Sequence, residues 1–223
     1  MKIIGYDFDG VFINIEDEKA ALFGKIVEQY WQAAPGPAAD IWLMNLGTSR
    51  KRKFEIVYRN RFQAELPQDD YRQIEHEYSQ RLMADYYPRA RLVPETADAV
   101  SELNGEFDLS FLSSGIPHEE VNGLMAHFGL DRFFDRIFGT NDTLASKADH
   151  FKLITHGQVP APGLFIGDGM EDMRVARQFG FTAIGLPTNH PASALREAGA
   201  DVVCEPGNVQ DEIRRRLRIG VGL

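Results

Sequence analysis

The chain has 223 residues, of which 43% are hydrophobic and 26% charged, and these proportions exclude collagen-like, low-complexity and largely disordered proteins. The lone Cys204 excludes an internal disulfide and a Cys-rich zinc site, which rules out a disulfide-stapled secreted domain. The net charge of −9 argues against general nucleic-acid binding, and we expect a cytoplasmic protein with neither a nucleic-acid nor a membrane partner.

The first predicted element is a buried strand, the apolar run Ile3-Ile4-Gly5-Tyr6, which leads into Asp7-Phe8-Asp9-Gly10. The run is too short to be the apolar segment of a signal peptide. From residue 15 to residue 87 the apolar side chains recur at helical spacing, and no strand is indicated. Pro35-Gly36-Pro37 breaks this block, which we predict to be entirely helical.

After Pro88, predicted strands alternate with predicted helices. The strands cover residues 107–112, 136–138, 164–166, 181–185 and 201–203, and the helices cover 94–103, 121–128, 146–154 and a segment ending at Gly180. This alternation indicates right-handed βαβ units and a parallel sheet. The predicted fold is therefore α/β, a Rossmann-like doubly wound parallel sheet. Residues 1–14 and 88–223 would form this core, and residues 15–87 would form an all-helical cap inserted after the first strand.

Polar side chains stand at the carboxyl ends of three predicted strands. They are Asp7 and Asp9, Ser113 and Ser114, and Asp168 and Asp172. Ligands of an open parallel sheet bind at this edge, and four carboxylates gathered there would repel one another unless a cation lay between them. Oxygen ligands with a partly hydrated shell suit Mg²⁺, and Lys147 at a predicted helix start could neutralise the remaining charge. The set predicts a phosphoryl-transfer site.

Such a site needs few reacting groups. One carboxylate can attack the phosphorus and form an aspartyl-phosphate, while positioning and charge stabilisation supply most of the rate. A metal ion lets the two anions approach each other. A second carboxylate two residues further on can protonate the leaving oxygen and then deprotonate the attacking water.

In order and spacing, these motifs resemble the haloacid dehalogenase superfamily, in its phosphoglycolate phosphatase and beta-phosphoglucomutase-like branch with a helical cap. Asp7-Phe8-Asp9-Gly10-Val11 is similar to the first motif of that family, and Ser113 to the second. Ser146-Lys147-Ala148-Asp149 is similar to the third, although it lacks the Lys-Pro pair often found there. The fourth is matched by Gly167-Asp168-Gly169-Met170-Glu171-Asp172.

The resemblance implies a role for each of these residues. Asp7 would be the nucleophile and Asp9 the general acid and base, which favours phosphate esters over halides because a departing halide needs no proton. The metal ligands implied are Asp7, Asp168, Asp172 and the backbone carbonyl of Asp9, and whether Glu171 assists them stays open. The phosphate-binding residues implied are Ser113, Ser114, Gly115 and Lys147.

Four consecutive basic residues, Arg50-Lys51-Arg52-Lys53, stand out in this acidic chain, after the predicted N-cap Thr48-Ser49. Successive helix positions point about 100° apart, so the four cannot face one ligand, whereas Arg50 and Lys53 share a face. These two either bind a carboxylate or second phosphate of the substrate or belong to a solvated helix face. The similarity of Gly47-Thr48-Ser49-Arg50 to cap segments of sugar-phosphate and phosphoglycolate-type phosphatases favours substrate binding.

We therefore predict a Mg²⁺-dependent phosphatase, monomeric or homodimeric, that acts on a small phosphorylated metabolite such as a sugar phosphate or a phosphoglycolate-like compound. A phosphomutase of the beta-phosphoglucomutase type would use the same core motifs, because it differs only in passing the phosphoryl group to a sugar instead of water. A non-catalytic ligand-binding protein of the same fold is the third reading.

Overall fold

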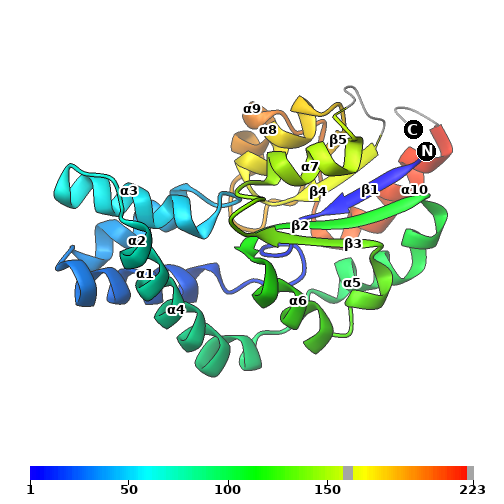
Figure 1. Cartoon of the computed structure of the whole chain (residues 1–223). Coiled ribbons are helices and arrows are strands. Elements are labelled where there is room, and N and C mark those ends of the chain that lie inside the picture. Colours follow the sequence, from blue (N-terminus) through cyan, green and yellow to red (C-terminus); the bar gives the residue numbers. More distant parts are fainter. Residues whose placement is uncertain (158–162, 220–223) are drawn as a thin grey trace.

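The computed structural model describes residues 1–157 and 163–219. It contains a parallel six-stranded sheet with helices packed on both of its faces (Figure 1). The strands are β1 (Ile3–Tyr6), β2 (Leu109–Pro117), β3 (Arg136–Thr140), β4 (Gly163–Gly167), β5 (Thr182–Gly185) and β6 (Val202–Val203). Their order is β3-β2-β1-β4-β5-β6, and every neighbouring pair is parallel. This order confirms the predicted doubly wound α/β fold. It reverses between β1 and β4, where such sheets bind their ligands.

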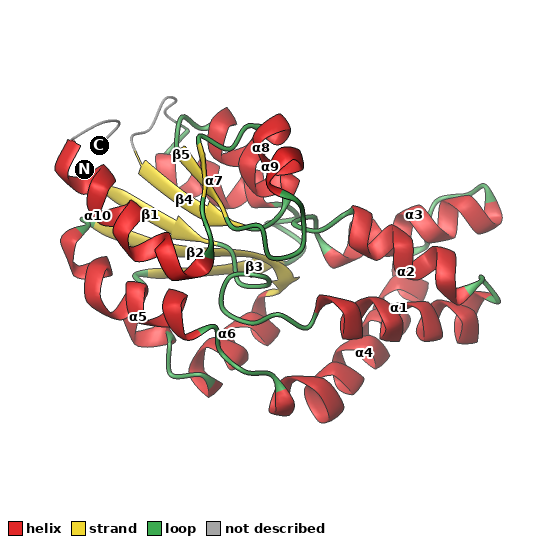
Figure 2. Cartoon of the chain, turned by 180° about the vertical axis from the view of Figure 1, so that it is seen from behind, coloured by secondary structure: helices red, strands yellow, loops and turns green. Residues whose placement is uncertain are grey.

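Helices cover both faces of the sheet, as Figure 2 shows from behind. One face packs against α7 (Lys147–Thr155), α8 (Met170–Gln178) and α9 (Ala192–Ala198), and the other against α5 (Pro94–Leu103), α6 (His118–His127) and α10 (Val209–Ile219). Side chains of β1 alternate between the two cores, with Ile3 on the α7 side and Ile4 on the α5 side. The alternation continues to Asp7, which therefore faces α7 and α8.

Four further helices lie beyond the carboxyl edge of the sheet (Figure 1). They are α1 (Glu16–Trp31), α2 (Pro35–Met44), α3 (Arg50–Phe62) and α4 (Gln68–Arg81), and a π-helical turn (Leu82–Tyr86) continues α4. Their shared core is aromatic, with Phe23 and Phe54 rings 4.7 Å apart and Trp42 and Tyr78 rings 5.3 Å apart. Residues 15–87 contain no strand, as predicted. We call α1–α4 the helical layer, and the exact limits of a cap domain at 15 and 87 stay a prediction.

One local expectation was wrong. The polar run Ser113-Ser114-Gly115 is part of β2 and not a turn, because pairing with β3 continues through a register shift as far as Pro117. The break predicted at Pro35-Gly36-Pro37 agrees with the structure, because α1 ends at Trp31 and Pro35 begins α2, where proline suits the first helical turn.

The N-terminus of α3 agrees with prediction, because the Ser49 hydroxyl accepts a hydrogen bond of 3.3 Å from the backbone N–H of Arg52. Within the described residues, no helix is long and apolar enough to cross a membrane.

Candidate active site

The loop after β1 brings two acidic segments into contact. The backbone N–H of Asp7 donates to the carbonyl of Ile166 in β4 at 2.8 Å, which fixes Asp7 to the sheet. Gly10 has a φ of +71°, and a Cβ built on it would lie 2.0 Å from an Asp168 carboxylate oxygen. Only glycine therefore lets the loops after β1 and β4 approach this closely.

Three buried carboxylates meet at this point. Asp7, Asp168 and Asp172 each offer an oxygen, and these oxygens lie within 4.8 Å of one another. The Lys147 ammonium joins two of them, at 2.8 Å from Asp7 Oδ2 and 2.5 Å from Asp172 Oδ1. With all three carboxylates ionised, one ammonium leaves an excess of two negative charges. Glu171 lies outside this group, and its carboxylate is 3.7 Å from Arg174.

Further hydrogen bonds orient the three carboxylates. The backbone N–H of Phe8 donates to Asp7 Oδ1 at 2.7 Å, and that of Gly169 donates to Asp172 Oδ2 at 2.9 Å. Asn189, which follows β5, donates its side-chain N–H to Asp168 Oδ2 at 2.6 Å. Nothing in the sequence pattern indicated Asn189, because it reaches Asp168 only through the pairing of β4 with β5.

The electrostatics of this group call for a cation. Burial first, and then repulsion from Asp172, raises the pKa of Asp7 to about 7, although Lys147 opposes the shift. Burial and the charges of Asp7 and Asp172 raise the pKa of Asp168 well above its usual range. Three buried oxygen donors with two uncompensated charges fit a divalent ion that prefers oxygen ligands, and Mg²⁺ is such an ion.

Asp9 lies nearby with a different partner. Its carboxylate accepts a hydrogen bond from the buried Lys19 ammonium, which is also 3.1 Å from Glu16 Oε1. Burial, with repulsion from Glu16 and Asp7, raises the pKa of Asp9 to about 6, while Lys19 lowers it. Sequence reasoning missed Lys19. The available signal was its position one helical turn before Phe23, on the apolar face of α1.

Ser113 lies next to Asp7 across the sheet, because β1 and β2 pair in a register that sets Tyr6 opposite Leu112. Its hydroxyl is buried and lies 2.9 Å from His150 Nδ1. The Ser114 hydroxyl is instead used within β2, where it accepts from the backbone N–H of Ile116 at 3.1 Å. The structure thus places Ser113, and not Ser114, on the same face of the sheet as the nucleophile candidate.

A cavity separates the sheet edge from the helical layer. Its lining combines residues predicted in the core with residues predicted in the cap, including Asp7, Asp9, Gly115, Lys147, Asp168, Arg50 and Lys53. The two parts touch beside it, because a Cβ on Gly115 would lie 2.6 Å from the Thr48 carbonyl oxygen. The predicted site residues therefore come from both parts and face one space.

Arg50 ties the helical layer to the core. Its guanidinium lies 2.6 Å from Glu120 Oε1 of α6 and donates to the second Glu120 oxygen at 2.9 Å. It also donates to Glu75 at 2.8 Å and to the Ser79 hydroxyl at 2.6 Å. The Tyr87 hydroxyl donates to Glu120 Oε1 at 2.9 Å. Arg50 is therefore buried, and both terminal nitrogens of its guanidinium are bound to protein partners.

Lys53 shares the face of α3 with Arg50, as predicted, but it is not paired. Its ammonium lies 3.8 Å from the centre of the Trp42 ring, and no carboxylate of the described chain lies within 4 Å of it. Burial lowers its pKa to about 8, although Glu16 opposes this shift. Of the two cations, Lys53 is the one still available to a ligand.

Comparisons with known proteins agree with this geometry. The sequence profile of the haloacid dehalogenase-like hydrolases matches residues 4–186. The chain belongs to this family. It is therefore an enzyme of the hydrolase class, and the resemblance inferred from the sequence motifs is confirmed. A phosphoglycolate phosphatase from Mannheimia succiniciproducens is 22% identical over 190 residues, which cover 83% of this chain and 85% of that protein.

Solved structures share the whole fold. A hydrolase from Pseudomonas syringae superposes with a TM-score of 0.77 at 17% identity, over 96% of this chain and 99% of that one. A candidate beta-phosphoglucomutase from Bacteroides vulgatus superposes with a TM-score of 0.79 at 15% identity, over 100% of this chain and 91% of that one. At these identities the likeness concerns the fold, and chemistry has to be argued from the site.

Proposed function

We propose that this enzyme is a Mg²⁺-dependent phosphatase that hydrolyses a small phosphate monoester through an aspartyl-phosphate. The observation that carries the proposal is the buried Asp7, held by Lys147 within three converging carboxylates at the end of the cavity. The phosphoglycolate phosphatase relative supports it. Asp7, Asp168, Asp172 and the Asp9 backbone carbonyl would hold Mg²⁺, which when bound would offset the charge between carboxylates and phosphate.

In the first step, an Asp7 carboxylate oxygen attacks the phosphorus, and the bond from phosphorus to the ester oxygen breaks. Asp9 gives its proton to the departing alkoxide. A pKa of about 6 suits this role, because such a group exchanges protons readily near neutral pH. Lys19 holds the Asp9 carboxylate in place from the helical layer.

In the second step, water attacks the phosphorus of the aspartyl-phosphate, Asp9 takes a proton from that water, and Asp7 is released. Lys147 contacts Asp7 throughout and would also bind a phosphoryl oxygen, because its ammonium has three donors. The Ser113 hydroxyl and the backbone at Gly115 would hold the other phosphoryl oxygens.

The substrate we propose carries a second anionic or strongly polar group, as sugar phosphates and phosphoglycolate-like compounds do. Lys53 lines the same cavity as Asp7, Asp9 and Asp168, and it lacks a protein carboxylate of its own in the described structure. Arg50 would contribute indirectly, by tying the helical layer to Glu120 of the core. We also propose that the enzyme is cytoplasmic, that it is a monomer or a homodimer, and that it binds neither nucleic acid nor a membrane.

A phosphomutase remains the alternative, because the fold is shared with a candidate beta-phosphoglucomutase and Asp9 can serve either acceptor. A panel of small phosphate esters assayed with Mg²⁺ separates the readings. We expect steady release of inorganic phosphate that a chelator abolishes. Transfer to a sugar without release of phosphate would favour the mutase, and no turnover of any ester would favour the ligand-binding protein.

Asp9→Asn tests the acid role. The variant keeps the backbone carbonyl but cannot protonate a leaving group, so hydrolysis should fall by about 10²-fold or more for alkyl phosphates. An activated aryl phosphate, whose leaving group needs less protonation, should lose less. Equal losses in kcat/KM on both substrates would rule out Asp9 as the acid.

A further inference from the structure

The mechanism above leaves one buried histidine without a role. His150 lies one helical turn after Lys147 on α7, so both side chains point towards the sheet. The His150 ring is fully buried and stacks on Phe138 of β3, with ring centres 5.3 Å apart and planes at 17°. Its Nδ1 lies 2.9 Å from the Ser113 hydroxyl oxygen.

The ring is neutral near pH 7, because burial and the charge of Lys147 lower the pKa of His150 to about 4, although a contact with the Gly139 backbone opposes the shift. A neutral imidazole has one N–H, either on Nδ1 or on Nε2. The Nε2 atom is buried and has no hydrogen-bond partner in the part of the chain that the structure describes. A proton on Nε2 would therefore leave a buried N–H unpaired, which is rare in folded proteins.

The position of this proton decides what Ser113 can offer. A hydroxyl has one hydrogen to donate and two lone pairs. If the proton is on Nε2, the Ser113 hydrogen must go to Nδ1, and only lone pairs face the negatively charged phosphoryl group. If the proton is on Nδ1, the ring donates to the Ser113 oxygen, and the hydroxyl hydrogen is free to point at that group.

We propose that His150 is a positioning residue, whose Nδ1–H donates to Ser113 Oγ and so directs the Ser113 hydrogen to a phosphoryl oxygen beside Asp7. The inference rests on the proposed function, since it deepens the role of Ser113 in that site. It also explains why α7 carries both residues. A single helix sets Lys147 against Asp7 and His150 against Ser113, so two phosphate contacts are fixed by one rigid element.

Three variants test this role. His150→Phe keeps an aromatic ring on Phe138 but removes the N–H, and we expect the dissociation constant of inorganic phosphate in the presence of Mg²⁺, and KM, to rise about tenfold. His150→Asn places an amide N–H near the position of Nδ1 and should recover most of the loss. His127→Phe, at an exposed position on α6, is the matched control and should change neither value.

A double-mutant cycle with Ser113→Ala adds a readout that a purely structural role would not give. If His150 acts through Ser113, His150→Phe should have little further effect on phosphate binding in the Ser113→Ala background. An equal effect in both backgrounds, or unchanged phosphate binding in His150→Phe, would overturn the inference.

The tautomer can also be read directly from the ¹⁵N shifts of His150 in the wild-type protein, without any turnover. A proton on Nδ1 supports the inference, and a proton on Nε2 overturns it. The two proposals fail separately. A wild-type enzyme that hydrolyses no phosphate ester refutes the phosphatase, whereas an active enzyme with the Nε2 tautomer refutes only the role of His150.

Discussion

Two groups of buried charges meet at the cavity, and they differ in how far opposite charges are paired. The core group has an excess of carboxylates, whereas most cations of the helical layer have a carboxylate partner. The core group has three carboxylates, and among the described residues only Lys147 compensates them. In the helical layer, Arg50 is matched by Glu75 and by Glu120 from the core. Lys19 is likewise matched by two carboxylates. Lys53 is the cation of this second group that the described residues leave without a carboxylate.

This difference distinguishes charged residues that stabilise the fold by pairing with each other from charged residues that are available to bind a ligand. A buried charge without a partner lowers stability, so it is retained where a ligand supplies the missing charge. By this criterion the core lacks a cation, and Lys53 lacks an anion. A phosphate ester with a second anionic group, bound together with Mg²⁺, would supply both.

The largest expected effect comes from the unbalanced core. Asp7→Asn keeps the shape of the side chain but removes the nucleophile, so kcat/KM should fall on the order of 10³-fold or more. The variant also removes one of the repelling charges, so its thermal unfolding should occur at or above the wild-type temperature. Turnover close to wild type in a folded variant would contradict the aspartyl-phosphate mechanism.

Disrupting the paired charges around Arg50 should lower the stability of the folded protein. Arg50→Met leaves Glu120 and Glu75 without their cation, and removing one partner of a buried pair costs about 3–5 kcal/mol. Urea unfolding should show a loss of this size, and the additional change Glu120→Gln should restore part of it. Unchanged stability with a raised KM would instead make Arg50 a substrate ligand.

The core site could be predicted from the sequence more completely than the contacts of the helical layer. The core site was predictable because each motif follows an apolar run, and parallel strands bring their carboxyl ends to one edge. That logic correctly placed Asp7 beside Asp168 and predicted Lys147 at a helix start. It missed the length of β2, because Ser113-Ser114-Gly115 has the composition of a turn and only pairing with β3 extends the strand.

The contacts of the helical layer were out of reach for a physical reason. Helical spacing shows that Arg50 and Lys53 share a face, but it does not show what that face meets. The partner of Arg50 is Glu120, 70 residues away on another helix. The pairing of His150 with Ser113 likewise joins positions 37 residues apart through sheet packing. Only the assembled fold distinguishes a paired cation from an unpaired one.

Binding of Mg²⁺ to the core group should raise the free energy of unfolding by an amount between the effects expected for Arg50→Met and Lys53→Met. A ligand at 100 times its dissociation constant adds about 2.7 kcal/mol to the free energy of unfolding. Because burial and Asp172 raise the pKa of Asp7 to about 7, protons compete with the metal below that pH. The stabilisation should therefore shrink as the pH falls from 8 to about 5. Calorimetric melts with and without Mg²⁺ measure it, and Asp168→Asn should abolish it.

Lys53→Met should change the free energy of unfolding less than the changes above. The change should also have the opposite sign to that of Arg50→Met, because Lys53→Met stabilises the fold. The drop in the pKa of Lys53 from 10.5 to about 8 means that the folded protein disfavours the ammonium. That penalty is on the order of 3 kcal/mol, and contact with Trp42 offsets a part of it. Met should therefore raise the stability at pH 7 by about 1–2 kcal/mol, while KM for a substrate with a second anion rises.

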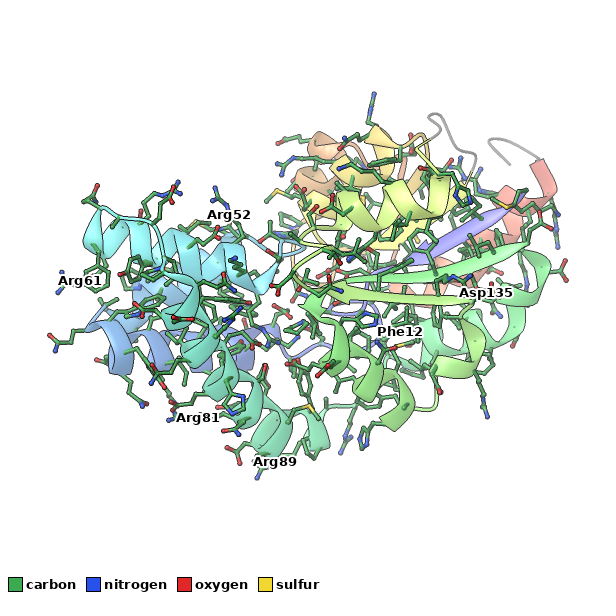
Figure 3. All side chains as sticks on the ribbon, in the orientation of Figure 1. Phe12, Arg52, Arg61, Arg81, Arg89 and Asp135 are labelled. Atoms are coloured by element: carbon green, nitrogen blue, oxygen red, sulfur yellow. The ribbon has the colours of Figure 1, made fainter. Side chains whose placement is uncertain are left out.

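Two comparisons make this last prediction decisive. Because the unfolded chain keeps the Lys53 proton between about pH 8 and 10.5 while the folded chain releases it, wild-type stability should approach that of Lys53→Met as the pH rises through this window. Arg52, one position away in the same basic run, is 51% exposed and points outward from α3 (Figure 3). Arg52→Ala should change stability by less than about 0.5 kcal/mol and leave KM unchanged. If Lys53→Met behaved like Arg52→Ala, the uncompensated charge would have no role in substrate binding.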